Sequence, residues 1–572
     1  MKRNILNILT VMSLLLLASC TKILDEQPRS VLTPDLFKTE SGLKDGLTAA
    51  YDGLRYISGT EATMGSTEMG TDEFTSAASG GSKELDMTPD NGGTGITPAT
   101  GGINVFWNYP FSFINTCNGV IEFGTEAGLS NAMIAEAHFL RGYYYFKMVQ
   151  MFGGVPLDLG SGELKFNTNP STLSKRNTQE EVYTAIIADL KFAEENLPES
   201  PRLPGCAFKA TAIHYLAKVY LTHGDDQLAL TEAEKLLNPS DPYSVNSYGV
   251  ALLDNYSDVI APGNERNSEI LFTCEHTEEY AFNETAAGWG SGPANKDDRS
   301  LSYYVPNYQQ FNLGRDGDVG FLIRTTEYSR PWVRFRATYG LLANVFSNKT
   351  SDSRFDASFQ TVWLNNNPDV TPNGLLNQPI DYGDTAFVML THEVSDAYRA
   401  SKNYRIWTPS QMDRTIFPAL KKFFDPNRQD PNDASGRPFL LAKLSETYLI
   451  AAEAAFNLGE NSKAYNYILI LRKRAATAGH VQDMIDATPG TITKDYILDE
   501  RSRELCGEQM RWFDLKRTGK WVDRAGTYSL NGVDLITRDI KDYYNLRPIP
   551  QAQIDLMGNS EAEKTAYQNP GY

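Results

Sequence analysis

Three glutamates near the C-terminus have a spacing that could support acid–base chemistry. Glu500, Glu504 and Glu508 recur every four residues, which places them on one face of a helix. Two carboxyl groups about 5 to 9 Å apart are what glycoside hydrolysis requires. However, Arg501 and Arg503 interleave with these acids, and nearby guanidiniums keep carboxylates ionised, which is the wrong state for a general acid. We therefore expect a charge network that ties this helix to its neighbours, with a glycosidase as the less favoured alternative.

Other catalytic or metal-binding motifs are missing from the sequence. The six histidines form no HExxH pair, and neither a GxSxG elbow nor a phosphate-binding loop occurs. Oxygen ligands crowd one loop, at Asp425, Asn427, Asp430, Asn432 and Asp433, and calcium binds six to eight such oxygens. Because the spacing is not that of an EF-hand, we expect a solvated turn. The sequence predicts no catalytic residue, no cofactor and no metal, and leaves a structural calcium open.

Aromatic side chains in irregular segments suggest a binding site instead. Sugar rings have apolar C–H faces that stack on flat aromatic rings, while neighbouring Asp, Asn, Gln or Arg side chains bond the hydroxyls. The candidate ligand contacts are Asp72, Trp107, Asn108, Trp289, Tyr303, Tyr304, Trp332, Tyr339 and Trp363. Any one of these rings could instead pack locally, so the prediction is a platform built from some of them.

Helical repeat units are expected to position these segments. Apolar residues recur at spacings of three and four over residues 35–57. Further helices are expected over residues 106–123, 131–152, 178–197, 494–508 and 510–518. Ala217 and Ala229, on either side of a turn at Gly224, give residues 207–237 the pattern of a tetratricopeptide hairpin, and residues 441–475 repeat it.

Two stretches interrupt the helical pattern. Residues 58–103 are rich in Gly, Ser and Thr, which predicts either a long functional loop or a variable insertion. Residues 250–435 show no sustained period apart from a short strand at 270–272. We predict one mainly α domain over residues 20–572, in which helical parts at 35–240 and 436–572 flank an irregular, loop-rich binding face with a few short strands.

The N-terminus has the features of an export signal with a lipid-attachment site. Lys2 and Arg3 precede an almost wholly apolar stretch, Ile5 to Leu17, which is too short to span a bilayer. Small residues then lead directly to Cys20. We predict a lipoprotein signal peptide over residues 1–19, lipidation of Cys20 and an extended tether over residues 20–34.

The net charge limits the possible binding partners, and the cysteine spacing bears on disulfides. The formal net charge is −18, which argues against nucleic acid and against docking on anionic lipid head groups. The other four cysteines are Cys117, Cys206, Cys274 and Cys506, and they show no CxxC spacing. An exported chain could pair them in two disulfides, although the sequence favours buried free thiols in a core of this size.

Several segments, in order, resemble the SusD/RagB family. They are Leu24–Pro28 after Cys20, Ala135–Arg141, Phe152–Leu157, Glu446–Ala454, Leu498–Leu505, Arg511–Arg517, Pro548–Pro550 and Gln568–Tyr572. His138 and the order Gly507-Glu508-Gln509 depart from the usual pattern. Residues 250–435 match poorly, as expected of a family with one scaffold and many ligands.

The resemblance implies a function as well as a fold. It implies a SusD-like fold of tetratricopeptide-like hairpins in a lipoprotein on the outer face of the outer membrane. It also implies a SusC-like TonB-dependent transporter as partner, to which captured oligosaccharide or polysaccharide is delivered. A peptide-binding RagB-like lipoprotein remains the alternative, with a surface glycoside hydrolase less favoured.

Overall fold

The computed structural model describes residues 34–572, except for residues 82, 170, 280–296 and 312–319. The predicted signal peptide, Cys20, residues 20–33 of the predicted tether and Trp289 lie outside the described residues. Among the residues that the structure describes, none of the helices combines the length and the apolar character that crossing a bilayer requires. Cys117, Cys206, Cys274 and Cys506 are free and buried, in agreement with the favoured prediction.

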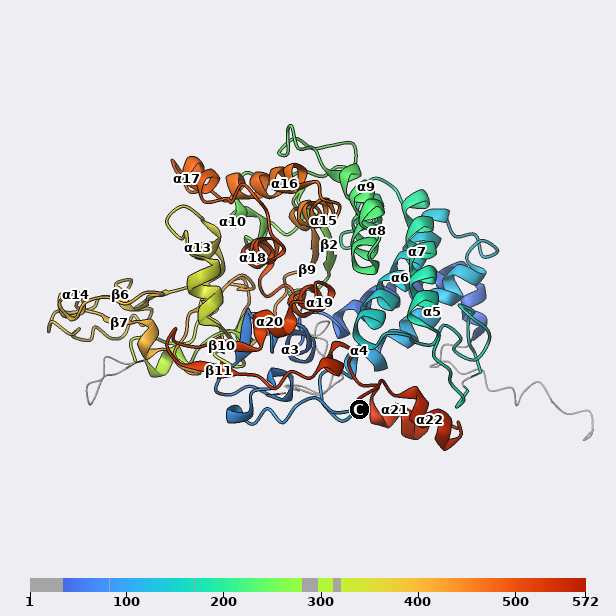
Figure 1. Cartoon of the computed structure of the whole chain (residues 1–572), viewed down its shortest axis with the longest axis horizontal. Helices are drawn as coiled ribbons and strands as arrows, with labels where there is room; N and C mark the ends of the chain where they lie inside the picture. The colour runs from blue at the N-terminus through green and yellow to red at the C-terminus, as the bar shows by residue number, and fades with distance from the viewer. Residues whose placement is uncertain (1–33, 82, 170, 280–296, 312–319) are drawn as a thin grey trace, which may run out of the picture.

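An array of antiparallel helices forms the scaffold. Its members are α2 (Glu40–Asp52), α5 (Pro110–Phe123), α6 (Asn131–Phe152), α7 (Gln179–Asn196), α8 (Lys209–His223), α9 (Asp226–Leu236), α15 (Leu444–Asn457) and α16 (Asn461–Arg474). Each helix packs on the next in this order. Helix α15 packs on α9, so the α15–α16 hairpin extends the array formed by α2 to α9. Figure 1 shows α5 to α9 side by side, with α15 and α16 beside α9. Both predicted hairpins are confirmed.

Local sequence explains where these helices start, turn and pack. The Thr178 hydroxyl accepts from the Glu181 backbone N–H, and the Glu181 carboxylate accepts from the Thr178 backbone N–H, which completes the predicted capping box of α7. Gly224 ends α8 with a φ of +103°, which a side chain would disfavour. Ala217 and Ala229 are fully buried, because small residues let α8 and α9 approach closely.

The predicted loop over residues 58–103 is wrong in its first part, whereas the described residues from 77 to 103 contain only turns and two short 3₁₀ turns. The segment contains α3 (Glu61–Glu68) and β1 (Phe74–Ser76), and Met64 and Phe74 are fully buried in the main core. The Ser and Thr residues of α3 led to the prediction of a loop, because these residues usually favour turns. Here they bond within α3, where Ser66 Oγ donates to the Ala62 carbonyl at 2.7 Å.

Short strands, most of them in the middle of the chain, pair into small sheets. The strand pairs are β1 with β3 (Phe335–Ala337), β2 (Ile270–Cys274) with β9 (Phe439–Lys443), β4 (Phe359–Gln360) with β8 (Ala419–Leu420), and β10 (Thr527–Ser529) with β11 (Leu535–Thr537). A three-stranded sheet has the order β5 (Val362–Leu364), β6 (Thr385–Met389), β7 (Arg405–Trp407). Its β5–β6 pair is antiparallel and its β6–β7 pair is parallel. The strand predicted at residues 270–272 is confirmed as part of β2.

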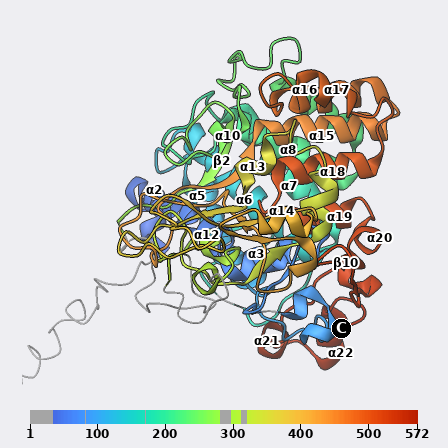
Figure 2. The same ribbon diagram turned by 90° about the vertical axis from the view of Figure 1, so that its left-hand side faces the viewer.

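Shorter helices complete the fold. They are α4 (Val105–Asn108), α10 (Tyr256–Val259), α12 (Ser300–Tyr303), α13 (Arg354–Ser358), α14 (Asp396–Ala400), α17 (Val481–Asp486), α18 (Lys494–Leu505), α19 (Arg511–Arg517), α20 (Trp521–Ala525), α21 (Gln551–Leu556) and α22 (Glu561–Tyr567). Figure 1 places β6, β7 and α14 at the opposite end of the long axis from α5 to α7. Both views place α16 and α17 at one end of the molecule and α21 and α22 at the other (Figure 2).

The glutamates of α18 belong to a buried charge network, as predicted. Glu500 Oε1 accepts from Arg354 Nη1 at 2.8 Å, and Glu500 Oε2 accepts from Arg503 Nε at 2.8 Å. Glu504 accepts from Arg354 at 3.0 Å and from Arg474 at 2.5 Å. Burial alone would raise the pKa of Glu500, but the surrounding guanidiniums, Arg354 foremost, hold it at about 2. These carboxylates are fully buried and ionised, so neither is suited to donate a proton to a substrate.

Glu508 departs from the predicted helix. Helix α18 ends at Leu505, and Gly507 follows with a φ of +77°, so Glu508 does not continue the face of Glu500 and Glu504. Its Oε1 accepts from the ammonium groups of Lys422 at 2.9 Å and Lys443 at 2.8 Å. The third glutamate therefore binds the strand β9 and the segment after β8 instead of stacking on the helix.

A buried carboxyl beside this network should make folding stability depend on pH. Burial first, and then the Asp72 carboxylate, raise the pKa of Glu73 from 4.5 to about 7, against the opposing effect of Arg511. The folded state therefore holds a proton that the unfolded state releases between about pH 4.5 and 7, and this contribution to stability is lost as pH rises through that window.

Replacing Glu73 with Gln should remove that pH-dependent component. We expect the free energy of unfolding of the wild type, relative to Glu73→Gln, to fall by up to ~3 kcal/mol between pH 5 and 8. Urea titrations of both proteins across this range measure the difference. Parallel pH profiles would contradict the assignment.

Candidate ligand-binding site

Two of the predicted tryptophan contacts are core residues. Trp107 is 1% exposed, and its ring meets Phe152 edge-on at 5.1 Å. Trp363 is fully buried, stacks on Tyr308 at 4.7 Å and lies 5.7 Å from Phe387. Their prediction as exposed stacking platforms is wrong, because other side chains already cover both rings.

The predicted tyrosine pair is also buried. Tyr303 and Tyr304 are each 1% exposed. Their rings pack against Phe335 at 5.8 and 5.3 Å. Tyr303 also lies under Trp332, with the two ring centroids 5.5 Å apart. The pair therefore supports the surface from beneath instead of presenting its own rings.

The remaining predicted contacts are dispersed. Asp72 accepts two hydrogen bonds from Arg511, each at 2.7 Å, and one from Arg524 at 2.7 Å. Despite burial, these guanidiniums lower the pKa of Asp72, so it is a structural ion-pair partner. Asn108 is exposed at the end of α4, and Tyr339 is half-buried with Gly532 against its ring. Trp332, also half-buried, is the predicted tryptophan that stays close to a surface cavity.

That cavity, here called the Trp407 groove, has a volume of about 440 Å³. It is lined by Ala78, Ser79, Asn307, Gln310, Phe311, Val333, Arg405, Trp407, Thr415 and Ile416. Segments far apart in sequence meet here: the loop after β1, the turn after α12, the segment that leads into β3, and β7 with the turn that follows it. The groove combines two half-buried aromatic rings with hydroxyl, amide and guanidinium groups, the composition expected of a carbohydrate site.

Strand geometry presents Trp407 and Arg405 together. Residues two apart on a strand share one face, and β7 buries Ile406 while leaving Arg405 and Trp407 half-buried. The Arg405 guanidinium carbon lies 4.5 Å from the centroid of the Trp407 ring, a distance that stabilises the ring orientation. Phe311 lies 6.0 Å from Trp407 and anchors on Phe387 at 5.5 Å. The groove thus has a supported aromatic wall.

Short turns hold the polar wall of the groove. The Asp413 carboxylate accepts from the Thr415 and Ile416 backbone N–H groups at 2.7 and 2.9 Å. The Ser79 N–H donates to the Val333 carbonyl at 3.0 Å, and the Gln310 N–H donates to the Asn307 carbonyl at 3.0 Å. The backbone N–H groups of these turns are therefore hydrogen-bonded within the protein. The side chains of Ser79 and Gln310 are exposed and that of Asn307 is half-buried, so a ligand can reach them.

A second feature, here called the Trp332 cluster, adjoins the groove. It comprises Trp332 and the guanidiniums of Arg299, Arg324, Arg330 and Arg334. Arg299, Arg330 and Arg334 lie 5.7, 5.8 and 5.5 Å from the Trp332 ring centroid. The cluster is connected to the groove because Arg334 Nη1 donates to the carbonyl of the lining residue Ser79. Arg324 Nη2 donates at 3.4 Å to Oε1 of Gln309, the neighbour of the lining residue Gln310.

The backbone between the two features is strained. Val333 has a φ of +55°, a conformation that costs a β-branched residue of order 1–3 kcal/mol. Its N–H donates to the Val305 carbonyl at 3.1 Å, and its carbonyl accepts from Ser79. Such strain persists only where the surroundings enforce it, and it concentrates at functional sites.

Sequence reasoning missed most of the groove. Trp407 was not a candidate, although Arg405-Ile406-Trp407 shows the alternation of a half-buried strand with a polar and an aromatic residue on one face. The arginine cluster also left a signal. Arg324, Arg330 and Arg334 fall within eleven residues of an otherwise acidic chain.

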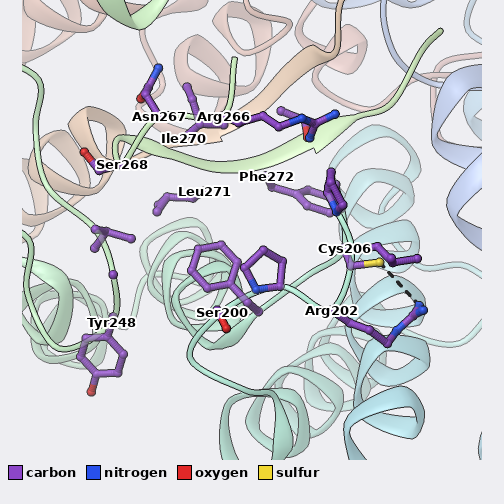
Figure 3. Close-up of a pocket in the computed structure, with 18 of the residues that line it drawn as sticks. Ser200, Arg202, Cys206, Tyr248, Arg266, Asn267, Ser268, Ile270, Leu271 and Phe272 are labelled. Atoms are coloured by element: carbon purple, nitrogen blue, oxygen red, sulfur yellow. Dashed lines mark hydrogen bonds between the residues drawn. The ribbon is translucent and has the colours of Figure 1, made fainter. Parts of the chain in front are cut away.

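A second cavity of the described part of the chain lies elsewhere. It has a volume of about 510 Å³ and lies between the loop that precedes α8 and strand β2 (Figure 3). Its two arginines are already paired. Arg202 pairs with Glu136 at 2.7 Å and contacts Cys206 Sγ at 3.5 Å, and Arg266 pairs with Glu275 at 2.6 Å. The guanidiniums that line this cavity are therefore already committed to carboxylates.

The oxygen-rich loop at residues 425–433 folds as hydrogen-bonded turns. Asp425 Oδ2 accepts from Ser435 Oγ at 3.1 Å and from the Gly436 N–H at 3.0 Å. Asp430 Oδ1 accepts from the Asn432 N–H at 2.7 Å. Within the described ranges, His, Cys, Asp and Glu side chains form no group of three or more that could hold a metal ion.

Comparison with protein families accounts for most of the chain. A family model described as "Starch-binding associating with outer membrane" matches residues 22–221, and one described as "SusD family" matches residues 301–572. SusD-like protein P2 of Formosa agariphila is 26% identical over 98% of this chain and 98% of its own length. Starch-binding protein SusD of Bacteroides thetaiotaomicron is 25% identical over 77% of this chain and 72% of its own.

Solved structures share the fold. A laminarin binding SusD-like protein superposes with a TM-score of 0.64 at 22% identity, covering 93% of this chain and 100% of that chain. Surface glycan-binding protein A from Bacteroides thetaiotaomicron has a TM-score of 0.64 at 19% identity, covering 94% of this chain and 100% of that chain. The predicted mainly α, SusD-like fold is confirmed, and the chain belongs to the SusD/RagB family.

Proposed function

We propose that the protein is a lipid-anchored, glycan-binding subunit on the outer face of the outer membrane. In this proposal it captures an oligosaccharide or polysaccharide in the Trp407 groove and delivers it to a SusC-like TonB-dependent transporter. It acts by binding alone, without hydrolysing the glycan.

The observation that carries the proposal is the make-up of the Trp407 groove. A strand-borne indole beside a phenyl ring offers flat apolar surface to sugar C–H faces. The hydroxyl of Ser79, the amides of Asn307 and Gln310 and the guanidinium of Arg405 surround these rings. A linear peptide, the alternative ligand, would instead be expected to pair with an exposed strand edge or a long apolar trough.

Family membership supports the location and the ligand class. The family description for residues 22–221 names starch binding and association with the outer membrane. A related structure is named for laminarin binding. Glycans are therefore the first class of ligand to test with this chain. The predicted signal peptide and Cys20 supply the anchor, and co-purification of a TonB-dependent barrel with the tagged protein tests the partner.

Affinity electrophoresis tests the proposal. The purified protein should be retarded in gels that contain its polysaccharide, and incubation with the same polysaccharide should release no reducing sugar. If the protein is retarded and also releases reducing sugar, it is a glycoside hydrolase and the proposal of binding alone is wrong. Binding to peptides but to none of a panel of glycans would favour the peptide-binding alternative.

A further inference from the structure

Two highly exposed leucines lie next to each other at the end of the molecule that carries α21 and α22. Leu556 ends α21 and is 77% exposed, and Leu173, in the loop that precedes α7, is 63% exposed. A Cβ atom on Gly558, two residues after Leu556, would lie 3.7 Å from Leu173 Cδ2. The two side chains are therefore neighbours, here called the leucine pair, and most of each is in contact with solvent.

Hydrogen bonds hold the two loops of the leucine pair together. The Gly558 N–H donates to the Thr172 carbonyl at 2.9 Å. Asn559 Oδ1 accepts from the Ser174 N–H at 3.0 Å, and the Asn559 amide donates to the Ser174 carbonyl at 3.1 Å. Because Thr172 and Ser174 flank Leu173, the backbone that presents this side chain is already ordered. A partner that covers the pair therefore does not have to order the loops first.

The described chain begins close to the leucine pair. Its first element is the 3₁₀ turn Pro34–Lys38, in which the Phe37 ring lies 4.9 Å from the Phe166 ring. Phe166 precedes Leu173 by seven residues, so the chain limits their separation to about 25 Å. Cys20 lies fourteen residues before this turn, a length that spans at most about 50 Å. A lipid on Cys20 and the leucine pair can therefore reach the same membrane surface.

The chemistry of the leucine pair favours a lipid surface over a protein partner. Hot spots of protein interfaces are enriched in Trp, Tyr and Arg, and leucine is under-represented among them. Leucine is instead one of the side chains that amphipathic segments bury at the boundary between head groups and acyl chains. Such insertion also needs no basic surface, which suits a chain with a formal net charge of −18.

We propose that Leu173 and Leu556 insert into the outer leaflet and form a second membrane contact beside the lipid on Cys20. The inference rests on the proposed function, because it requires that anchor. A lipid on a tether leaves the body free to turn, whereas two contacts fix its orientation. Because β7 and α22 lie toward different ends of the molecule (Figure 1), the second contact sets the direction in which the Trp407 groove faces.

Fluorophores at single positions of the full lipidated protein test the inference. Leu173→Cys and Leu556→Cys are each labelled with an environment-sensitive dye, and the protein is reconstituted into phosphatidylcholine vesicles. We expect a blue shift of the emission and a loss of quenching by aqueous iodide at both positions. Tyr382→Cys, at a side chain that is 66% exposed and lies before β6, is the matched control and should stay quenched. Cys117, Cys206, Cys274 and Cys506 are buried and should not take up the dye.

A charged substitution ties the effect to the leucine pair. Leu556→Asp, at a position where the charge stays in water when the protein is free, should restore iodide quenching of the dye at position 173. Equal quenching at positions 173, 556 and 382 would overturn the inference and leave the anchor and the proposed function standing. A blue shift that needs a co-reconstituted transporter would assign the pair to that protein and would also overturn the inference. Failure of the protein to stay with the vesicles would overturn the lipid anchor of the proposed function itself.

Discussion

Trp407→Ala should abolish glycan retention at concentrations where the wild type binds. The indole is the largest flat surface in the Trp407 groove, and Arg405 lies 4.5 Å above it. Central aromatic contacts of this kind contribute about 2 kcal/mol or more, or roughly thirtyfold in Kd. Affinity electrophoresis over a series of polysaccharide concentrations gives the two dissociation constants directly.

Two further variants separate stacking from general damage. Trp407→Phe keeps an aromatic face and should retain part of the affinity. Tyr382→Ala removes a ring that is 66% exposed and outside the groove, so it should bind as the wild type does. If a folded Trp407→Ala protein binds as the wild type does, the Trp407 groove is not the glycan-binding site.

Glu504→Gln should lower the free energy of unfolding by about 3–5 kcal/mol, the cost of breaking one side of a buried ion pair. Glu504 is fully buried and accepts from Arg354 at 3.0 Å and Arg474 at 2.5 Å. A neutral amide leaves both guanidiniums short of their counter-charge in a region that water does not reach. The urea midpoint, followed by tryptophan fluorescence, measures the loss.

An exposed glutamate provides the matched control. Glu40 pairs with Lys44 at 2.6 Å on the surface of α2, and exposed pairs at this spacing contribute only about 0.3–0.5 kcal/mol. Glu40→Gln should therefore leave the midpoint almost unchanged. If Glu504→Gln proved equally mild, the network would not be a stabilising element and Glu504 would return as a candidate for chemistry.

The scaffold was predictable because its signals are local. A few neighbouring residues are enough to indicate the capping box at Thr178, the turn at Gly224 and the close helix packing at Ala217 and Ala229. The α18 network was predictable for the same reason. Acids and arginines alternate along one helix, although its end at Leu505 was not anticipated.

The site was largely unpredictable because its members meet only in the tertiary structure. Ser79, Asn307, Val333 and Trp407 come from four separate segments, and nothing near any one of them indicates the others. Sequence also does not distinguish an aromatic residue in a small core from one on a surface. Trp363 and Trp407 both lie on strands of the same sheet, yet the first is fully buried by its neighbours. The buried helix α3 was hidden by its Ser and Thr content.

The most direct test of the account is a crystal structure of the protein with a retained oligosaccharide. We predict that a sugar ring lies against Trp407, with its hydroxyls bonded to Asn307, Gln310 or Arg405. A ligand bound instead in the cavity between the loop before α8 and strand β2, with the Trp407 groove empty, would contradict the central claim.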